Sequence, residues 1–488
     1  MPPAAIRQAF VEALADRRQA GPGKSYLQGT YSGNGIMTGT VNLREVVLGI
    51  LMEVTEEEAY SHIVLRGTLE KYQYLPKRDR AFISRVTEGT LENLIQIDYI
   101  IECFSKVPIH NMKPMIRNIL RMSIYQLKYM DSIPDSAVVN EAVRLAQKRG
   151  FYNLKGFVNG VLRAAARGMD EIAYPLPSED PVEYLSVSYS MPQWILLRWL
   201  EQFSFEEVEK VCDSFRNELP VTVRLRTDRV SREEIIASLK EEGCEVEQHP
   251  YLDYAVRICG YNYLQALTAF RQGWIYVQDV SSMLVSEVAA PNWGDYCIDV
   301  CAAPGGKSTH LADKLKGSGY VEARDKNEDK VELMQENIER LGIINMVAAL
   351  KDATVFEQES FHRADIVLCD VPCSGLGVIG KKQDIRYRMN PARQEELIRI
   401  QRRILSVSQN YVKPGGVLIY STCTIGADEN QMNLKYFLEN FPFHLESIDP
   451  YIPEQLRTRT SAGGFLQLLP GIHETDGFFL ARLKRNEE

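Results

Sequence analysis

The feature that most constrains the fold is an alternation of short apolar runs with helical patterns, from about Trp274 to the C-terminal end. The apolar runs are YCIDVC, GYVEARD, NMVAAL, ADIVLCD, GVLIYST and GFFLARLKR. Strands that alternate with helices predict a mostly parallel, doubly wound sheet, that is, a Rossmann-like α/β domain over residues 274–488. Such sheets bind ligands beyond the carboxyl ends of their strands, where the strand order reverses.

The preceding residues have other patterns, so that a chain of 488 residues is expected to be multidomain. Residues 41–170 have apolar positions at helical spacing, such as Val46 and Ile50, which predicts an all-α bundle. Residues 171–273 mix amphipathic helices with alternating strands, which predicts a small α+β domain. Residues 1–40 are rich in Gly, Ser and Thr without an apolar period, and are predicted to be a disordered extension.

The composition is that of an ordinary globular protein, with 45% hydrophobic and 25% charged residues. The sequence contains no membrane-length apolar run and no signal peptide, and the nine cysteines have no disulfide-like rhythm, which together predict a cytoplasmic protein with reduced thiols. The net charge of −9 is unevenly spread, because residues 41–170 carry a small basic excess. Since nucleic-acid binding needs only a local basic surface, the charge neither favours nor excludes it.

A loop of small residues follows the first strand of the α/β domain, in the segment CIDVCAAPGGKSTHLADKL at 297–315. Small residues let the backbone approach a ligand closely, and the helix that follows offers free amides. The loop matches neither a Walker motif nor G-x-G-x-x-G. Asp325, Asp352 and Asp370 follow the next three strands, where acids can bind ribose hydroxyls. The combination predicts a nucleoside ligand without phosphates, for which S-adenosylmethionine is the natural candidate.

Three motifs, CAAPGGK (301–307), DVPCSG (370–375) and STCT (421–424), resemble the signatures of the RNA 5-methylcytosine methyltransferase superfamily, which includes Sun/Fmu and NSUN. Within it, VVNEAVRLAQK (138–148) and GFVNGVLR (156–163) are similar to the NusB-like domain of the small-subunit ribosomal RNA methyltransferase B subfamily. YVQDVSSMLV (276–285) and LLPGIHETDGFF (468–479) also match that subfamily, so the resemblance covers roughly residues 41–485. The pattern departs from that of the family at Arg324, Lys351 and Gln383.

The resemblance implies an S-adenosyl-L-methionine-dependent enzyme without a metal. It implies cofactor contacts from Cys301, Ala302, Ala303, Pro304, Gly305, Gly306, Lys307, Asp325, Asp352 and Asp370. It also implies that Cys423 is the nucleophile and that Cys373 helps to release the product. The implied substrate is a 16S rRNA cytosine of the cytosine 967 class, in rRNA that is not yet assembled, and the enzyme is expected to be a monomer.

Carbon 5 of cytosine is a poor nucleophile, which explains why this chemistry needs thiols. When a thiolate adds to carbon 6, carbon 5 becomes enamine-like and can accept a methyl group, and the adduct must then break down. Cys423 would make the adduct and Cys373 would assist its breakdown, while Asp370 would hold the cytosine edge. Lys307 would orient the nucleotide, although a lysine at a helix start can equally well face solvent.

RNA contacts are expected from Arg386, Tyr387 and Arg388, which could grip phosphate and stack on a base, unless they form only a solvated loop. The basic segments KRDR (77–80), QKRG (147–150) and VRLRTDR (223–229) predict that the helical and α+β domains bind RNA. The target base must leave any stack to be modified.

Other assignments stay open for the same residues. The spacing of Cys297 with Cys301 and of Cys369 with Cys373 could indicate zinc, but it lacks the tighter knuckle spacing of zinc sites. Five cysteines are expected to be buried as small apolar side chains, namely Cys103, Cys212, Cys244, Cys259 and Cys369. Alternative functions are methylation of tRNA, methylation of a small molecule, and RNA binding or antitermination without catalysis.

Overall fold

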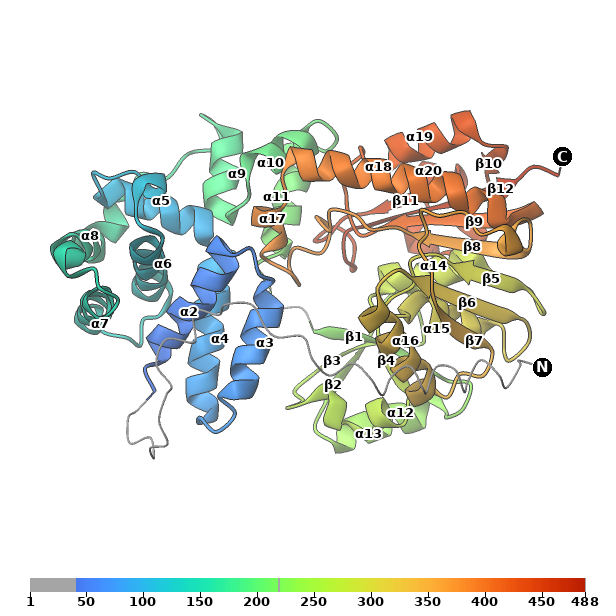
Figure 1. Ribbon diagram of the computed structural model, residues 1–488, viewed down its shortest axis with the longest axis horizontal. Coiled ribbons are helices and arrows are strands. Elements are labelled where there is room, and N and C mark those ends of the chain that lie inside the picture. The colour runs from blue at the N-terminus through green and yellow to red at the C-terminus, as the bar shows by residue number, and fades with distance from the viewer. Residues whose placement is uncertain (1–40, 218–219, 488) are drawn as a thin grey trace. The chain divides into compact units, whose positions relative to one another are not determined.

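The computed structural model describes residues 41–217 and 220–487, so the extension predicted for residues 1–40 lies outside the described range (Figure 1). The chain divides into two compact units, and the second contains Glu88–Ile109 and everything from Arg163 onward. Among the described helices, none combines the length and the apolar character needed to cross a membrane.

The first unit is helical and contains the described residues up to Thr87 together with His110–Leu162. The helices that begin in it are α2 (Leu43–Glu56), α3 (Ser61–Lys71), α4 (Lys77–Glu92), α6 (Pro114–Tyr129), α7 (Asp135–Lys148) and α8 (Lys155–Gly168). Asn42 caps α2, because its side chain accepts a hydrogen bond from the Glu45 amide at 3.1 Å. The predicted apolar stripe, including Val46 and Ile50, is buried, and α2 packs on α6. The predicted all-α bundle is confirmed.

The second unit begins with helices α5 (Leu94–Phe104), α9 (Pro181–Tyr189), α10 (Gln193–Leu200) and α11 (Phe205–Ser214). Ser204 starts α11 through a reciprocal capping box with Glu207. The fully buried Trp199 belongs to a core that also contains Leu376 and Ile379, from the segment that follows β8. These helices therefore anchor the chain just beyond Cys373.

A four-stranded antiparallel sheet follows, in the order β2-β3-β1-β4. Its elements are β1 (Val221–Leu225), α12 (Arg232–Glu241), β2 (Glu245–Gln248), β3 (Ala255–Cys259), α13 (Thr268–Arg271) and β4 (Ile275–Val277). This is the predicted α+β domain, but the structure places its end later than residue 273. Sequence analysis assigned Ile275–Val277 to the next domain, whereas these residues pair with β1.

The large sheet has the order β10-β12-β9-β8-β5-β6-β7, and β11 pairs with β12. Its strands are β5 (Tyr296–Asp299), β6 (Tyr320–Asp325), β7 (Met346–Leu350), β8 (Ala364–Asp370), β9 (Val412–Thr422), β10 (Phe443–Leu445), β11 (Phe465–Leu468) and β12 (Phe478–Arg485). Adjacent strands in the run β9-β8-β5-β6-β7 are parallel to one another, whereas β12 is antiparallel to β9. The predicted Rossmann-like sheet is confirmed.

Helices cover both faces of this sheet (Figure 1). They include α14 (Val280–Ala289), α15 (Gly306–Lys314), α16 (Glu328–Leu341), α18 (Pro391–Ser408) and α19 (Gln431–Asn440). The short helix α20 (Arg459–Ala462) contacts β11, whereas α17 (Ile385–Arg388) packs with α10 and α11 through Ile385. Side chains of β8 alternate between two cores: Ile366 packs with α14, α15 and α16, whereas Val367 packs with α18 and α19. A strand buried on both faces explains why this stretch is continuously apolar.

Candidate active site

Five neighbouring parallel strands end at the same edge of the large sheet, in the order β9, β8, β5, β6, β7. The strand order reverses between β5 and β8, because β5 leads to β6 on one side and β8 leads to β9 on the other. The ends of these strands, the loops after them and the start of α15 carry all the predicted catalytic and cofactor-binding residues. The predicted residues therefore gather where sheets of this class bind ligands.

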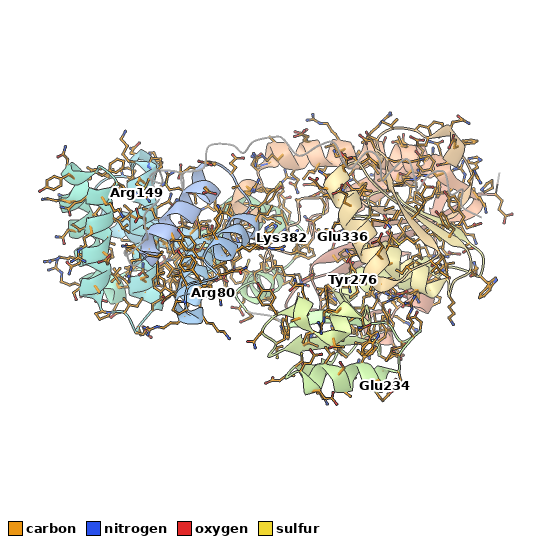
Figure 2. The ribbon with its side chains drawn as sticks, turned by 60° about the horizontal axis from the view of Figure 1, so that its bottom comes forward. Arg80, Arg149, Glu234, Tyr276, Glu336 and Lys382 are labelled. Atoms are coloured by element: carbon orange, nitrogen blue, oxygen red, sulfur yellow. The ribbon has the colours of Figure 1, made fainter. Side chains whose placement is uncertain are left out.

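The loop 301–307 leads from β5 into α15 in a tight turn. Gly305 has a φ of 100°, a left-handed conformation that favours glycine. A Cβ on Gly306 would lie 3.0 Å from the ring of Tyr276, which is labelled in Figure 2 and whose hydroxyl donates to the Pro304 carbonyl at 3.3 Å. The small residues thus keep the backbone near the start of α15 open to a ligand.

Asp299 fixes both ends of this loop, and sequence analysis did not single it out. Its carboxylate, 1% exposed, accepts a hydrogen bond from the Ser308 hydroxyl at 2.6 Å and one from the Cys301 amide at 3.4 Å. Burial raises the pKa of Asp299 to about 7. An acid at the end of the strand before a small-residue loop was the signal that could have identified it.

The far end of α15 is held by an ion cluster that corrects one prediction. Arg224 and Arg226, from the segment expected to bind RNA, are buried and pair with Asp313 of α15. Arg226 also donates to the carbonyls of Gly273 and Leu341, at 3.0 and 2.7 Å. These two guanidinium groups join the small sheet to α15 and face the interior, so they are not available to an RNA backbone.

Asp325 and Asp352 lie at the ends of β6 and β7. Asp325 is 7% exposed and accepts from the Asn327 amide at 3.0 Å, whereas Asp352 is exposed and accepts from the Thr354 amide at 2.8 Å. Arg324, which departs from the family pattern, is buried and donates to Glu322 and Ser360 inside the sheet. Two carboxylates beside an open small-residue loop fit a nucleoside cofactor that lacks phosphates.

Cys373 and Cys423 lie side by side, although 50 residues separate them in the chain. Their Sγ atoms are 3.2 Å apart, a distance at which one thiol donates a hydrogen bond to the other. The pKa of Cys423 is lowered, mainly by the hydrogen bond from Cys373. Burial and Asp370 oppose this shift, whereas Lys307 and Lys382 support it. The same hydrogen bond, together with burial, raises the pKa of Cys373 well above its usual value. These directions favour the thiolate at Cys423 and the thiol at Cys373.

The sequence left open whether Lys307 faces solvent, and in the structure it does not. Its ammonium lies 2.7 Å from Asp370, and its side chain is only 15% exposed. Burial opposes the charge of Lys307, but Asp370 outweighs burial and raises the pKa of the lysine. Ser421 donates to the other oxygen of Asp370 at 2.8 Å, a contact that the sequence pattern did not reveal. The site thus contains a fixed cation and a fixed carboxylate beside the two thiols.

Backbone contacts join the loops that carry the two thiols. The Gly377 amide donates to the Cys423 carbonyl at 3.0 Å, and the Gly477 amide donates to the Gly377 carbonyl at 2.9 Å. A Cβ on Gly377 would lie 2.1 Å from the Gly477 carbonyl oxygen, so only glycine fits there. The Ser374 hydroxyl also donates to Thr424 at 3.0 Å. These contacts fix the distance between the thiols.

The segment DIRYR differs from the surface loop that sequence analysis expected. Arg386 is 1% exposed and donates to the carbonyls of Tyr189 and Ser190, at 3.1 and 3.3 Å. Tyr387 is half-buried and donates to the Ser190 carbonyl at 3.2 Å, and the half-buried Arg388 lies 3.7 Å from Asp384. Arg386 and Tyr387 therefore have interior partners in the preceding helices. An arginine-rich segment resembles a solvated loop in sequence because its buried acceptors lie almost 200 residues away.

The other cysteines follow the predictions only in part. Cys212, Cys244 and Cys369 are buried as expected, whereas Cys103 and Cys259 are exposed. In the part of the chain that the structure describes, no group of three His, Cys, Asp or Glu side chains is arranged to bind a metal ion.

Comparisons with known families match all three parts of the chain. Residues 287–484 match "16S rRNA methyltransferase RsmB/F", residues 41–167 match "NusB family", and residues 191–262 match "Methyltr_RsmF/B-like, ferredoxin-like domain". The matches confirm the predicted helical, α+β and Rossmann-like methyltransferase parts and the resemblance that the motifs indicated.

Two curated relatives are similar over nearly their whole length. "Probable ribosomal RNA small subunit methyltransferase B" of Bacillus subtilis (strain 168) is 35% identical over 454 residues, covering 91% of this chain and 99% of the relative. "Ribosomal RNA small subunit methyltransferase B" of Klebsiella pneumoniae (strain 342) is 31% identical, covering 92% and 99%. The solved structure "Crystal Structure of PH0851" has a TM-score of 0.76 at 26% identity and covers 91% of this chain and 99% of its own.

Proposed function

The chain belongs to the family of ribosomal RNA small subunit methyltransferase B, and we propose that it methylates carbon 5 of a 16S rRNA cytosine of the cytosine 967 class through a covalent cysteine adduct. The observation that carries this proposal is the pair of Sγ atoms 3.2 Å apart at the carboxyl edge of the sheet. The ion pair of Lys307 and Asp370 beside them supports it. RNA binding alone would leave this arrangement without a role.

The first step assigns Cys423 as the nucleophile. Its thiolate forms a bond to carbon 6 of cytosine, and the displaced electron pair moves toward N3. The Asp370 carboxylate accepts a hydrogen bond from the N4 amino group of the base, a donor that uracil lacks. Lys307, held at 2.7 Å from Asp370, places a positive charge near the edge on which negative charge develops.

The second step assigns Cys373 to the breakdown of the adduct. Once carbon 5 carries the methyl group, a base from solvent takes its proton, the electron pair of that C–H bond forms the double bond between carbons 5 and 6, and the bond between Sγ and carbon 6 breaks with its pair on sulfur. The leaving group is the Cys423 thiolate, to which the Cys373 thiol can donate a hydrogen bond across 3.2 Å. A thiol that stays protonated suits this role, and the raised pKa of Cys373, due to the hydrogen bond with Cys423 and to burial, favours that state.

The cofactor is proposed to be S-adenosyl-L-methionine, which supplies an electrophilic methyl group when bound. The loop 301–307 would contact it through its backbone, and Asp325 and Asp352 would accept hydrogen bonds from hydroxyl groups. A buried hydrogen bond from Ser308 to Asp299 holds the start of α15 in position next to this loop.

The substrate is proposed to be rRNA before assembly, because the target base must leave its stack to reach the half-buried thiols. The enzyme is proposed to be a monomer in the cytoplasm. Lys77 and Arg78 of the NusB-like part are exposed and can contact the RNA backbone. Lys382, which is exposed and whose charge acts on Cys423, and Arg388 are the candidate RNA contacts of this segment, while Arg386 and Tyr387 support its fold.

The test is methyl transfer from isotopically labelled S-adenosylmethionine to a 16S rRNA transcript, followed by mapping of 5-methylcytosine. We expect one modified cytosine in 16S rRNA and no transfer to tRNA or free cytidine. Transfer to tRNA alone would move the proposal to another RNA, and transfer to cytidine alone would indicate a small-molecule enzyme. No transfer to any of the three would contradict the proposed function.

A further inference from the structure

A buried carboxylate lies behind Cys373 and has no role in the reaction so far. Glu429, between Cys423 and α19, is 0% exposed. Its Oε2 accepts hydrogen bonds from the Ser374 amide at 2.9 Å and from Gln401 at 2.8 Å, and its Oε1 accepts one from Gln394 at 3.2 Å. All three donors are neutral, so they solvate the carboxylate without neutralising its charge.

The same network clamps the chain on both sides of Cys373. The amide group of Gln401 donates to Glu429 and also to the carbonyl of Pro372, at 2.9 Å. Glu429 in turn binds the amide of Ser374. The residues immediately before and after the thiol are therefore held by one buried pair of side chains, which are themselves carried by the chain leading to α19 and by α18.

The charges around the two thiols differ. The hydrogen bond from Cys373 lowers the pKa of Cys423, burial and Asp370 oppose this shift, and Lys307 and Lys382 support it. Glu429 acts on Cys373, whose pKa is raised first by the hydrogen bond with Cys423, then by burial, and also by the charge of Glu429. A buried carboxylate bound to the backbone next to Cys373 therefore favours the shared proton on Cys373.

We propose that Glu429 is a positioning residue that clamps the Cys373 loop and keeps the shared proton on Cys373, so that Cys423 is the nucleophile. This inference rests on the proposed two-cysteine function, and it explains which of the two thiols attacks the base. Glu429 acts through Cys373 and does not touch the base.

The experiment measures the alkylation of each thiol in the full-length free protein. Iodoacetamide is added near neutral pH, and the rates at Cys373 and Cys423 are followed by mass spectrometry of their peptides. In the wild type we expect Cys423 to react faster, because the thiolate is the reactive form. In Glu429→Gln we expect the rate at Cys423 divided by the rate at Cys373 to fall about tenfold, which corresponds to a change of about one unit in the pKa difference between the two thiols. An unchanged ratio in a folded Glu429→Gln variant would overturn the proposal.

Glu446→Gln is the matched control, because Glu446 pairs with Arg482 and Lys484, residues of β12 that lie outside the cysteine pair. We expect it to keep the wild-type ratio, and a fall in that ratio as large as in Glu429→Gln would also overturn the proposal. Alkylation needs neither RNA nor cofactor. The ratio therefore tests Glu429 even if the proposed methyl transfer fails, and a failure of transfer with a changed ratio would count against the function alone.

A second variant covers the case in which Glu429→Gln does not fold. Gln401→Met keeps the carboxylate but removes the donor that Glu429 and Pro372 share. With RNA and S-adenosylmethionine present, we expect the covalent adduct per enzyme to rise several-fold above the wild type, because Cys373 is less firmly placed to assist breakdown. An adduct level equal to that of the wild type would overturn the clamp.

Discussion

The loops after β8 and β9 carry the same reactive group but place it in different surroundings. Charges of both signs act on Cys423, from Asp370, Lys307 and Lys382, whereas Cys373 is backed by the buried Glu429. The two Sγ atoms are 3.2 Å apart, so distance alone does not distinguish them. In the proposed mechanism, the hydrogen bond between the thiols and the buried Glu429 distinguish the attacking cysteine from the assisting one.

The loops also differ in how they are held. The Cys423 loop is held by Asn430, whose side chain accepts a hydrogen bond from Thr422 and donates one to the Thr424 carbonyl. The Cys373 loop is held on both sides of its thiol by Glu429 and Gln401. Substitutions can therefore weaken the Cys373 loop selectively, which makes the comparison testable.

The largest effect is expected for Cys423→Ala. Without the nucleophile, the initial rate of methyl transfer to 16S rRNA should fall on the order of 10⁴-fold or more, as removal of a covalent nucleophile does in other enzymes. Cys259→Ala, which removes an exposed thiol of the small sheet, should retain the wild-type rate. A Cys423→Ala variant with a rate near that of wild type would contradict the assignment of Cys423 as the nucleophile.

The next largest effect is expected for Cys373→Ala, and it should appear mainly after the first methyl transfer. Single-turnover transfer should slow only several-fold, because Cys423 loses the hydrogen bond that lowers its pKa, whereas multiple turnover should slow by about 10²–10⁴-fold, the range for the loss of an acid–base group. The measurement compares enzyme in excess with RNA in excess. An equal loss in both regimes would mean that Cys373 takes part in the attack.

A smaller effect, with a defined dependence on pH, is expected for Lys307→Met. The positive charge of Lys307 helps to lower the pKa of Cys423, so its removal should raise that pKa. Because the thiolate is the reactive form, the rising limb of the pH profile should move up by about one unit, with a rate about tenfold lower below the pKa. Lys314→Met, at the other end of α15, should leave the limb in place. An unmoved limb in Lys307→Met would show that this lysine does not bias the pair.

The smallest effect is expected for Thr424→Val, which removes the acceptor of the hydrogen bond from Ser374 without changing the volume much. A single hydrogen bond contributes about 1 kcal/mol, so the release of methylated RNA should slow by about fivefold. Quenched-flow measurement of product release would detect this change. A tenfold or larger fall in the attack rate instead would mean that the bond serves Cys423 and not Cys373.

The sequence predicted the fold and the position of the site well, because both depend on local patterns. Strands buried on two faces are continuously apolar, and the residues that follow parallel strands meet at one edge. Asp370 was found in this way, whereas Cys373, Cys423 and Lys307 were indicated by the family resemblance; the structure brings the two thiols within 3.2 Å and Lys307 within 2.7 Å of Asp370, and their roles stay predictions. The end of the small sheet was placed too early because three residues of β4 look like the start of the next domain.

The sequence could not predict which polar residues are buried. Arg224 and Arg386 have the same local composition as surface arginines, and only partners distant in the chain, such as Asp313 and the Tyr189 carbonyl, place them inside. Glu429 is one acid among many in the sequence, and its contact with Ser374 spans 55 residues. Long-range polar pairing therefore sets the limit of what local patterns reveal.

The most direct test of the central claim is a denaturing gel of protein with unmodified 16S rRNA and S-adenosylmethionine, comparing the wild type, Cys373→Ala and Cys423→Ala. The account predicts a covalent RNA–protein band that accumulates with Cys373→Ala and is absent with Cys423→Ala. The opposite pattern, with a band for Cys423→Ala and none for Cys373→Ala, would contradict the assignment of the nucleophile.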